Sequence, residues 1–176
     1  SFYHGMVPVG FYAIALTMST PITMFSKAVS QSAYKSFVHE ERIPRKLLLI
    51  SLLWSTVGAL VLWFACQTLI PLFFTAKYSA ALSVLPWIMA GVALAGLNHP
   101  FHAFLAAHRQ GRAIRIMSVT TSTVNIALNF LLIPTMAMTG AAIAYISTYA
   151  LNIVMNLYFY RSAVTEHVAP QTTDEE

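Results

Sequence analysis

The stretch Asn98-His99-Pro100-Phe101-His102 carries the most chemically versatile side chains of the sequence. A histidine can exchange a proton near neutral pH, and an asparagine can both donate and accept hydrogen bonds. Proline bends a helix and frees backbone carbonyl groups upstream, and interrupted helices at membrane depth often border transporter binding sites. We therefore predict that Asn98 and His102 line a cavity, with His99 at the edge of the same face. A proline kink stabilised by the neighbouring asparagine is the structural alternative.

Two basic residues, Lys27 and Arg115, could hold an anionic ligand because each lies in or beside a long apolar segment. For Lys27 the alternative is that the ammonium group extends to the membrane surface, as lysines near the ends of spans do. All six acidic residues fall outside the apolar segments, so these segments supply no carboxylate for a proton or sodium relay.

Polar side chains also recur at helical spacing within the apolar segments. At about 100° per residue, residues in a narrow arc share one face of a helix. Such faces include Ser19, Thr23, Ser26 and Ser30 in one segment, Ser122, Asn125 and Asn129 in a second, and Thr148, Asn152 and Asn156 in a third. These stripes face either other helices or a hydrated cavity, because polar groups in lipid need partners or water. Both interpretations stay open, and we select as candidate cavity residues Ser122, Asn125, Asn129 and Asn152.

The elements that must position these residues are membrane-spanning helices. The 176-residue chain is 57% hydrophobic and only 9% charged, whereas soluble domains carry about 25% charged residues. A spanning helix needs about 20 mostly apolar residues. The predicted spans are 11–33, which turns polar after Phe25, and 47–69, 81–107, 113–134 and 139–160. The sequence therefore predicts an all-α, polytopic transmembrane helical bundle of about five spans over residues 1–161.

The sequence also predicts the connections between the spans. Residues 70–80 have Pro71 as their second residue and are predicted to be an interfacial connection. Pro134 is predicted to end the fourth span, and Gly140 should let the next span approach its neighbour closely, which makes a tight helical hairpin. Residues 162–176 are polar and are predicted to form a disordered cytoplasmic tail.

The positions of lysine and arginine predict the orientation. Eight of the ten fall in the first and third connections or after the last span, and only Lys77 falls in a connection on the opposite side. With alternating spans, those two connections and the C-terminus are cytoplasmic. Because Ser1 is not a start methionine and no signal-peptide pattern follows, we expect the sequence to be part of a longer protein.

Several functional classes receive no support from the sequence. A net charge of +4 is too small and scattered for a nucleic-acid interface. A single cysteine, Cys66, cannot form an internal disulfide, and no Cys/His spacing is typical of a metal site. Phosphate-binding loops, nucleophile elbows and HExxH motifs are absent from the sequence, so we expect no enzyme, no metal and no cofactor.

One block of the sequence resembles a known family. The block runs Asn125-Ile-Ala-Leu-Asn129-Phe-Leu-Leu-Ile-Pro134 and continues, after a short connection, as Gly140-Ala-Ala-Ile-Ala144. It is similar to the pattern N-x-x-L-N-x-x-L-I-P, turn, G-A-A-x-A of the polysaccharide-biosynthesis (O-antigen type) flippases, in the multidrug/oligosaccharidyl-lipid/polysaccharide exporter superfamily. That family normally has a glycine three residues after the proline, where this chain has Ala137. Weaker likenesses extend the resemblance over about residues 10–160.

The resemblance implies the C-terminal portion of a two-lobed transporter whose helices surround a central cavity. Such a protein flips an undecaprenyl-diphosphate-linked oligosaccharide repeat for surface polysaccharide, including the O-antigen of lipopolysaccharide, across the bacterial inner membrane. The expected partners are this lipid-linked oligosaccharide, membrane lipids, the remaining helices of the full-length protein and a glycan polymerase. Lys27 and Arg115, with the polar stripes, would then line the cavity. The alternatives are a cation-coupled multidrug exporter of the same superfamily and a non-transporting membrane scaffold.

Overall fold

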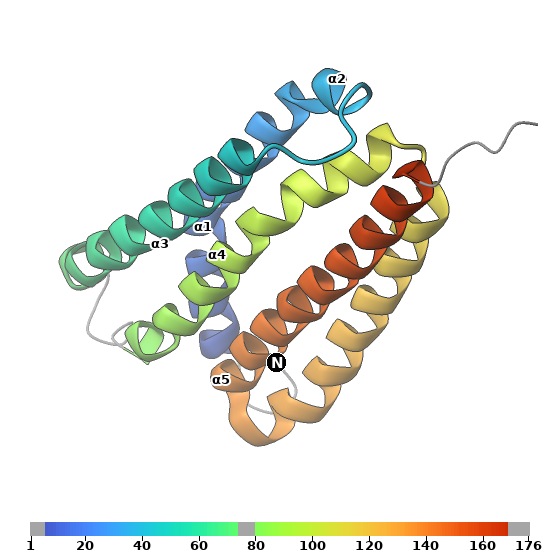
Figure 1. Ribbon diagram of the computed structural model, residues 1–176. Helices are drawn as coiled ribbons and strands as arrows, with labels where there is room; N and C mark the ends of the chain where they lie inside the picture. Colours follow the sequence, from blue (N-terminus) through green and yellow to red (C-terminus); the bar gives the residue numbers. More distant parts are fainter. Residues whose placement is uncertain (1–5, 74–79, 169–176) are drawn as a thin grey trace, which may run out of the picture.

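The computed structural model describes residues 6–73 and 80–168, and over these residues the chain is helical with short connections and no strand (Figure 1). This confirms the predicted all-α helical bundle. The helices are α1 (Met6–Ser32), α2 (Tyr34–Phe37), α3 (Arg45–Phe73), α4 (Ala80–Ala107) and α5 (Gly111–Val168).

Helix α5 is a hairpin and not a single rod. Ala137 has φ 49° and ψ −123°, and the segments before and after it fold back side by side (Figure 1). We call residues 111–136 the first arm and residues 138–168 the second arm. The Nδ2 atom of Asn125 on the first arm donates a hydrogen bond to Thr148 Oγ1 on the second, at 3.0 Å. The two arms correspond in position to the predicted spans 113–134 and 139–160.

The turn between the arms differs in detail from the sequence prediction. Pro134 was expected to end the first arm, but the backbone stays helical until Ala137, where it breaks. A proline clashes mainly with the turn before it, so a few further helical residues can follow it. A side chain at Gly140 would collide with the backbone carbonyl of Leu132, so a glycine is required where the second arm begins. The close approach predicted for Gly140 is therefore present.

Three helices within the described residues are long and apolar enough to cross a membrane. They comprise Arg45–Thr68 of α3, Val84–Ala107 of α4 and the bent stretch Gly111–Thr165 of α5. Large apolar side chains cover their outer faces, among them Phe130 with an exposed fraction of 79%. Such a surface suits contact with lipid, and the chain is therefore a membrane protein. Helix α1 is not one of the three, so the span at 11–33 stays a prediction.

Helix α4 lies in the middle of the bundle, with α1 and α3 on one side and α5 on the other (Figure 1). Its buried residues Leu85, Ile88 and Val92 form one core with Ile22 of α1 and Ala142 of α5. Small residues let the neighbouring helices come close. A side chain at Gly91 would collide with the Tyr145 ring, and one at Gly96 would collide with Ser55. Close helix contact through small residues is typical of membrane bundles.

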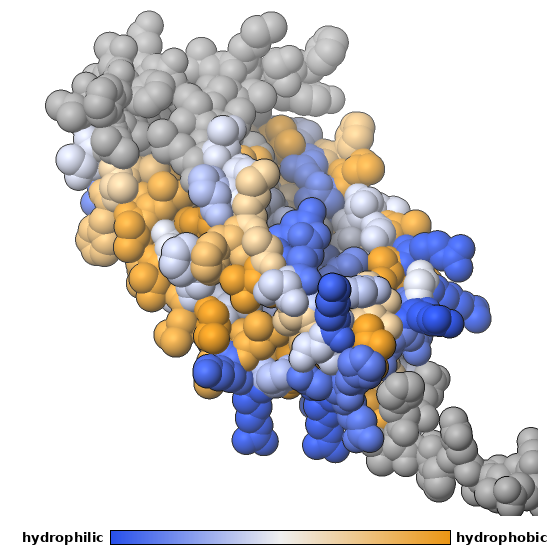
Figure 2. Space-filling view, turned by 90° about the horizontal axis from the view of Figure 1, so that it is seen from above, coloured by the Kyte–Doolittle hydropathy of each residue, from blue (hydrophilic) through white to orange (hydrophobic). Residues whose placement is uncertain are grey.

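The segments rich in lysine and arginine meet at one end of the bundle. A second core joins Phe37 of α2 and Ile43 to Phe104 of α4, with Tyr160 of α5 packed against it. The Tyr160 hydroxyl accepts a hydrogen bond from the Ile43 backbone N–H at 3.3 Å. Figure 2, which looks onto this end, shows hydrophilic side chains along its lower and right borders and hydrophobic ones to the left. We call it the basic end, and its orientation toward the cytoplasm stays a prediction.

Two predicted boundaries were wrong. Helix α3 continues through Pro71 to Phe73, so the connection that was expected at 70–80 begins later, and residues 74–79 lie outside the described part. Helix α5 continues to Val168, so residues 162–168 are helical and do not form a disordered tail. The reason is packing, because Ala163 is buried beside Leu105 and Met117. Residues 169–176 lie outside the described residues.

The backbone at Ala137 generates a stability prediction. A positive φ is unfavourable for alanine and costs on the order of 1–3 kcal/mol in such regions, whereas glycine adopts it freely. We expect Ala137→Gly to raise the free energy of unfolding in detergent micelles by about 1 kcal/mol. Ala127→Gly, at an exposed position inside the first arm, should instead lower it by about 0.5–1 kcal/mol. Equal effects of the two substitutions would contradict a strained turn at Ala137.

Candidate functional site

A polar groove runs along the bundle between α1, α4 and the second arm of α5. One part has a volume of about 380 Å³ and is lined by residues that include Ser19, Thr20, Thr23, Lys27, His99, Tyr145 and Tyr149. The adjoining part, of about 460 Å³, is lined by residues that include Lys27, Ser30, Gln31, Tyr34, His99 and His102. Lys27 and His99 line both parts, so we treat them as one surface and call it the α1–α4 groove.

Helix α1 supplies the cation and most of the hydroxyl groups of this groove. Ser19, Thr23, Lys27 and Ser30 follow one another at spacings of three or four residues and therefore share a face. The hydroxyls are held by the backbone of their own helix, since Ser19 donates to Leu16 O at 2.7 Å and Ser30 donates to Ser26 O at 2.8 Å. Lys27 is exposed in the groove and forms no ion pair with the carboxylates that the structure describes.

Helix α4 supplies the two histidines. His99 and His102 are both half-buried, and at three residues apart they point toward the same neighbour, α1. Helix α4 remains helical from Ala80 to Ala107 with Pro100 inside it, as the continuous span predicted at 81–107 requires. The histidines therefore keep regular helical spacing, which brings both into the groove. The structure thus places His102 and Lys27, two of the predicted cavity residues, on one surface, and it adds His99.

Asn98 and Asn152 belong to a polar contact between helices and not to the groove lining described above. Asn156 is fully buried on the second arm, and its Nδ2 donates to Asn98 Oδ1 at 2.7 Å and to Asn152 Oδ1 at 2.8 Å. Asn98 Nδ2 in turn donates to Leu94 O at 3.1 Å. We call these three asparagines the amide clamp. For Asn98 and Asn152 the alternative given for the polar stripes, contact between helices, fits this arrangement.

The remaining predicted cavity residues lie on the first arm of α5, away from the lining of the α1–α4 groove. Asn125 bonds to Thr148, and Asn129 Nδ2 donates to the Asn125 backbone carbonyl at 2.8 Å, so both asparagines join or stiffen the hairpin. Ser122 and Arg115 are exposed on the same flank. Their stripe borders the apolar outer face, because Ile126 and Val119 lie only about 20–40° from Arg115 around the helix.

Several groove residues were missed as individual site candidates. Tyr145 and Tyr149 lie one turn apart and their rings contact each other, with centroids 4.8 Å apart. The sequence placed Tyr145 on a polar stripe, but an aromatic residue inside an apolar span is also ordinary packing. Gln31 lies in the last turn of α1 and Tyr34 begins α2, and in the sequence both are typical of surface residues. Only the crossing of α1 over α4 brings them to the histidines.

No protein-family model, curated protein or solved structure matches this chain. The chemistry of the groove is therefore argued from its own residues.

An ammonium group, two imidazoles, three phenols and several hydroxyls can bind an anion and hydroxyl-rich groups. Within the described residues, no group of three His, Cys, Asp or Glu could hold a metal ion. This set of groups suits an anionic, polar ligand.

Water access to the groove can be tested with single cysteines in a Cys66→Ala background. We expect Thr23→Cys, which lies in the groove, to react in membranes with a charged thiol reagent that does not cross lipid. Val119→Cys is the matched control, because its position is 67% exposed but on the apolar outer face. Equal reactivity of the two cysteines, or an unreactive cysteine at position 23, would contradict a hydrated groove.

The amide clamp can be tested by a double-mutant cycle on Asn98→Ala and Asn156→Ala. Hydrogen bonds between membrane helices contribute about 0.6 kcal/mol on average and up to about 1.7 kcal/mol. We expect a coupling within that range in the free energy of unfolding, because the two amides bond directly at 2.7 Å. Asn129→Ala, combined with Asn98→Ala, is the control pair and should give additive effects. Additive effects for the first pair would show that the clamp contributes no specific interaction.

Proposed function

We propose that this chain forms part of a pathway that moves an undecaprenyl-diphosphate-linked oligosaccharide across the bacterial inner membrane. The observation that carries the proposal is the α1–α4 groove, a polar surface within an apolar bundle, with Lys27 at the junction of its two parts. The resemblance of residues 125–144 to O-antigen type flippases supports the same class of substrate. The basic end would then face the cytoplasm, in accordance with the excess of lysine and arginine there.

The groove offers a partner for each part of such a substrate. The Lys27 ammonium would pair with the diphosphate, since charge-assisted hydrogen bonds to phosphate are strong. The hydroxyls of α1 and the imidazoles of His99 and His102 would bind sugar hydroxyls. The polyprenyl chain needs an apolar path, and the exposed Met24 of α1 lines the groove. A substrate with an apolar tail can therefore keep that tail in lipid while its head group occupies the groove.

The two alternatives differ in what they require of the same residues. A cation-coupled drug exporter would need a carboxylate for its ion, and the described lining of the groove consists of basic, hydroxyl, amide and aromatic groups with apolar residues. A scaffold without transport would need only interactions between helices, and the amide clamp and the Asn125–Thr148 bond supply those. The groove is the feature that the scaffold hypothesis leaves without a role.

Lys27→Gln tests the proposal directly. We expect it to lower translocation of a fluorescent polyprenyl-diphosphate oligosaccharide by about tenfold in vesicles that contain the full-length protein, because loss of a charged hydrogen bond to the diphosphate costs on the order of 1.4 kcal/mol or more. Lys27→Arg should retain most activity, since it keeps the charge.

Two matched variants complete this experiment. Lys35→Gln removes the same charge at the basic end but outside the groove lining, and we expect it to leave translocation unchanged. Arg115→Gln tests the first-arm stripe, and we expect a smaller effect than that of Lys27→Gln because Arg115 lies outside the groove. Full activity of Lys27→Gln, at normal protein levels, would overturn the proposal.

A further inference from the structure

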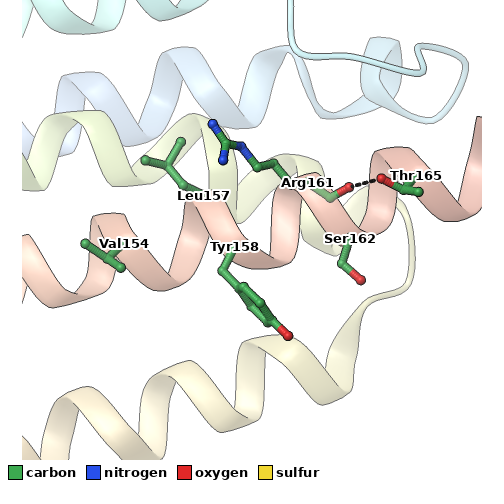
Figure 3. Close-up of a pocket in the computed structure, with 6 residues that line it drawn as sticks. All are labelled: Val154, Leu157, Tyr158, Arg161, Ser162 and Thr165. Atoms are coloured by element: carbon green, nitrogen blue, oxygen red, sulfur yellow. Dashed lines mark hydrogen bonds between the residues drawn. The ribbon is translucent and has the colours of Figure 1, made fainter.

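A second hollow lies at the basic end, on the outer face of the second arm of α5. Its volume is about 710 Å³, and its lining residues, shown in Figure 3, are Val154, Leu157, Tyr158, Arg161, Ser162 and Thr165. They recur at spacings of three and four residues and so form one face of a single helix. We call it the outer face.

The outer face is separate from the α1–α4 groove. On the second arm the groove is lined by Tyr145 and Tyr149, which are nine and five residues before Val154. At about 100° per residue these tyrosines point roughly 140–180° away from Val154 around the helix. The two surfaces therefore lie on opposite sides of the same arm, and a ligand of one does not contact the other.

The chemistry of the outer face changes in order along the helix. Val154 and Leu157 are apolar and have exposed fractions of 63% and 41%, and Tyr158 is 69% exposed. Arg161 and Ser162 follow, and both are exposed. Aromatic residues prefer the boundary between hydrocarbon and water, and basic residues prefer the level of lipid phosphates beyond it. The order apolar, tyrosine, arginine and hydroxyl thus matches the profile of one membrane leaflet.

The arrangement of Arg161 suits a phosphate. Figure 3 shows its side chain directed back along the helix toward Leu157, while Tyr158 and Ser162 point to the side of the first arm. The Thr165 hydroxyl donates to the Arg161 backbone carbonyl at 2.8 Å, and this bond leaves the guanidinium group uninvolved. No ion pair is found for Arg161 among the side chains that the structure describes. Arg161 lies seven positions after Val154, about 10 Å farther along the helix. This distance exceeds the thickness of the head-group layer of one leaflet.

We propose that the outer face binds an anionic phospholipid of the membrane. Its phosphate contacts the Arg161 guanidinium, and one acyl chain lies along Leu157 and Val154. Charge complementarity and the leaflet-like order of the residues select this ligand over a zwitterionic lipid. The site does not depend on the proposed transport function.

The test is a titration of the purified full chain in neutral detergent, followed by native mass spectrometry. The probes are phosphatidylglycerol and phosphatidylcholine with identical acyl chains. We expect phosphatidylglycerol to bind more tightly than phosphatidylcholine, and Arg161→Gln to weaken its binding by about fivefold, the effect of one basic contact at a lipid surface. Arg161→Lys should keep the preference, because it keeps the charge.

Two further variants locate the contact. Arg112→Gln removes an exposed arginine at the same end of the bundle but outside the outer face, and it should leave binding unchanged. Leu157→Ser should weaken both lipids, since it removes an acyl contact.

Four outcomes would overturn the proposal. They are equal affinity for the two lipids, equal losses in Arg161→Gln and Arg112→Gln, competition by glycerol phosphate at the affinity of the whole lipid, and a protein dimer that Leu157→Ser dissociates. The last of these would assign the face to a second copy of the chain.

Discussion

A polar group among acyl chains has no water to bond with, so the protein itself must supply its partner. This constraint accounts for most of the polar contacts in the bundle. Serine and threonine hydroxyls donate to carbonyl groups one turn back in their own helices, as Ser55 does to Ser51 O at 2.8 Å. The longer asparagine side chains reach further and join different helices, as in the amide clamp. The polar residues in this chain thus mainly determine how neighbouring helices pack.

The same constraint makes the α1–α4 groove informative. Lys27 has three N–H donors and forms no ion pair with a carboxylate among the described residues. His99 and His102 lie beside it, so the groove concentrates hydrogen-bonding capacity that packing alone does not require. Helix packing leaves Asn98 and Asn156 buried and bonded, whereas it leaves Lys27 open to the outside of the bundle. Asn98 and Asn156 thus join helices, whereas Lys27 is available to a ligand.

The sequence predicted the general fold well, because spans of about 20 apolar residues and basic connections are direct consequences of the membrane. It also predicted the hairpin around Pro134 and Gly140. It could not decide which face of each helix packs where, since a stripe such as Asn125 and Asn129 is compatible with a lumen or with a helix contact. Lys27 and His102 were found because a charged or titratable group inside a span is unusual. The ends of the helices were misjudged where tertiary packing, as at Ala163, extends a helix beyond its apolar run.

The turn at Ala137 shows how such a bundle tolerates a local cost. A positive φ at alanine is unfavourable, but the arms on both sides are joined by the Asn125–Thr148 bond, and the close contact at Gly140 fixes the distance between them. A turn of few residues lets the two arms lie side by side along their length (Figure 1). The strain is therefore local, while the contacts that offset it extend along both arms. For the same reason the second arm can present a groove to α1 on one side and an outer face to lipid on the other, since its position is fixed by the first arm and by α4.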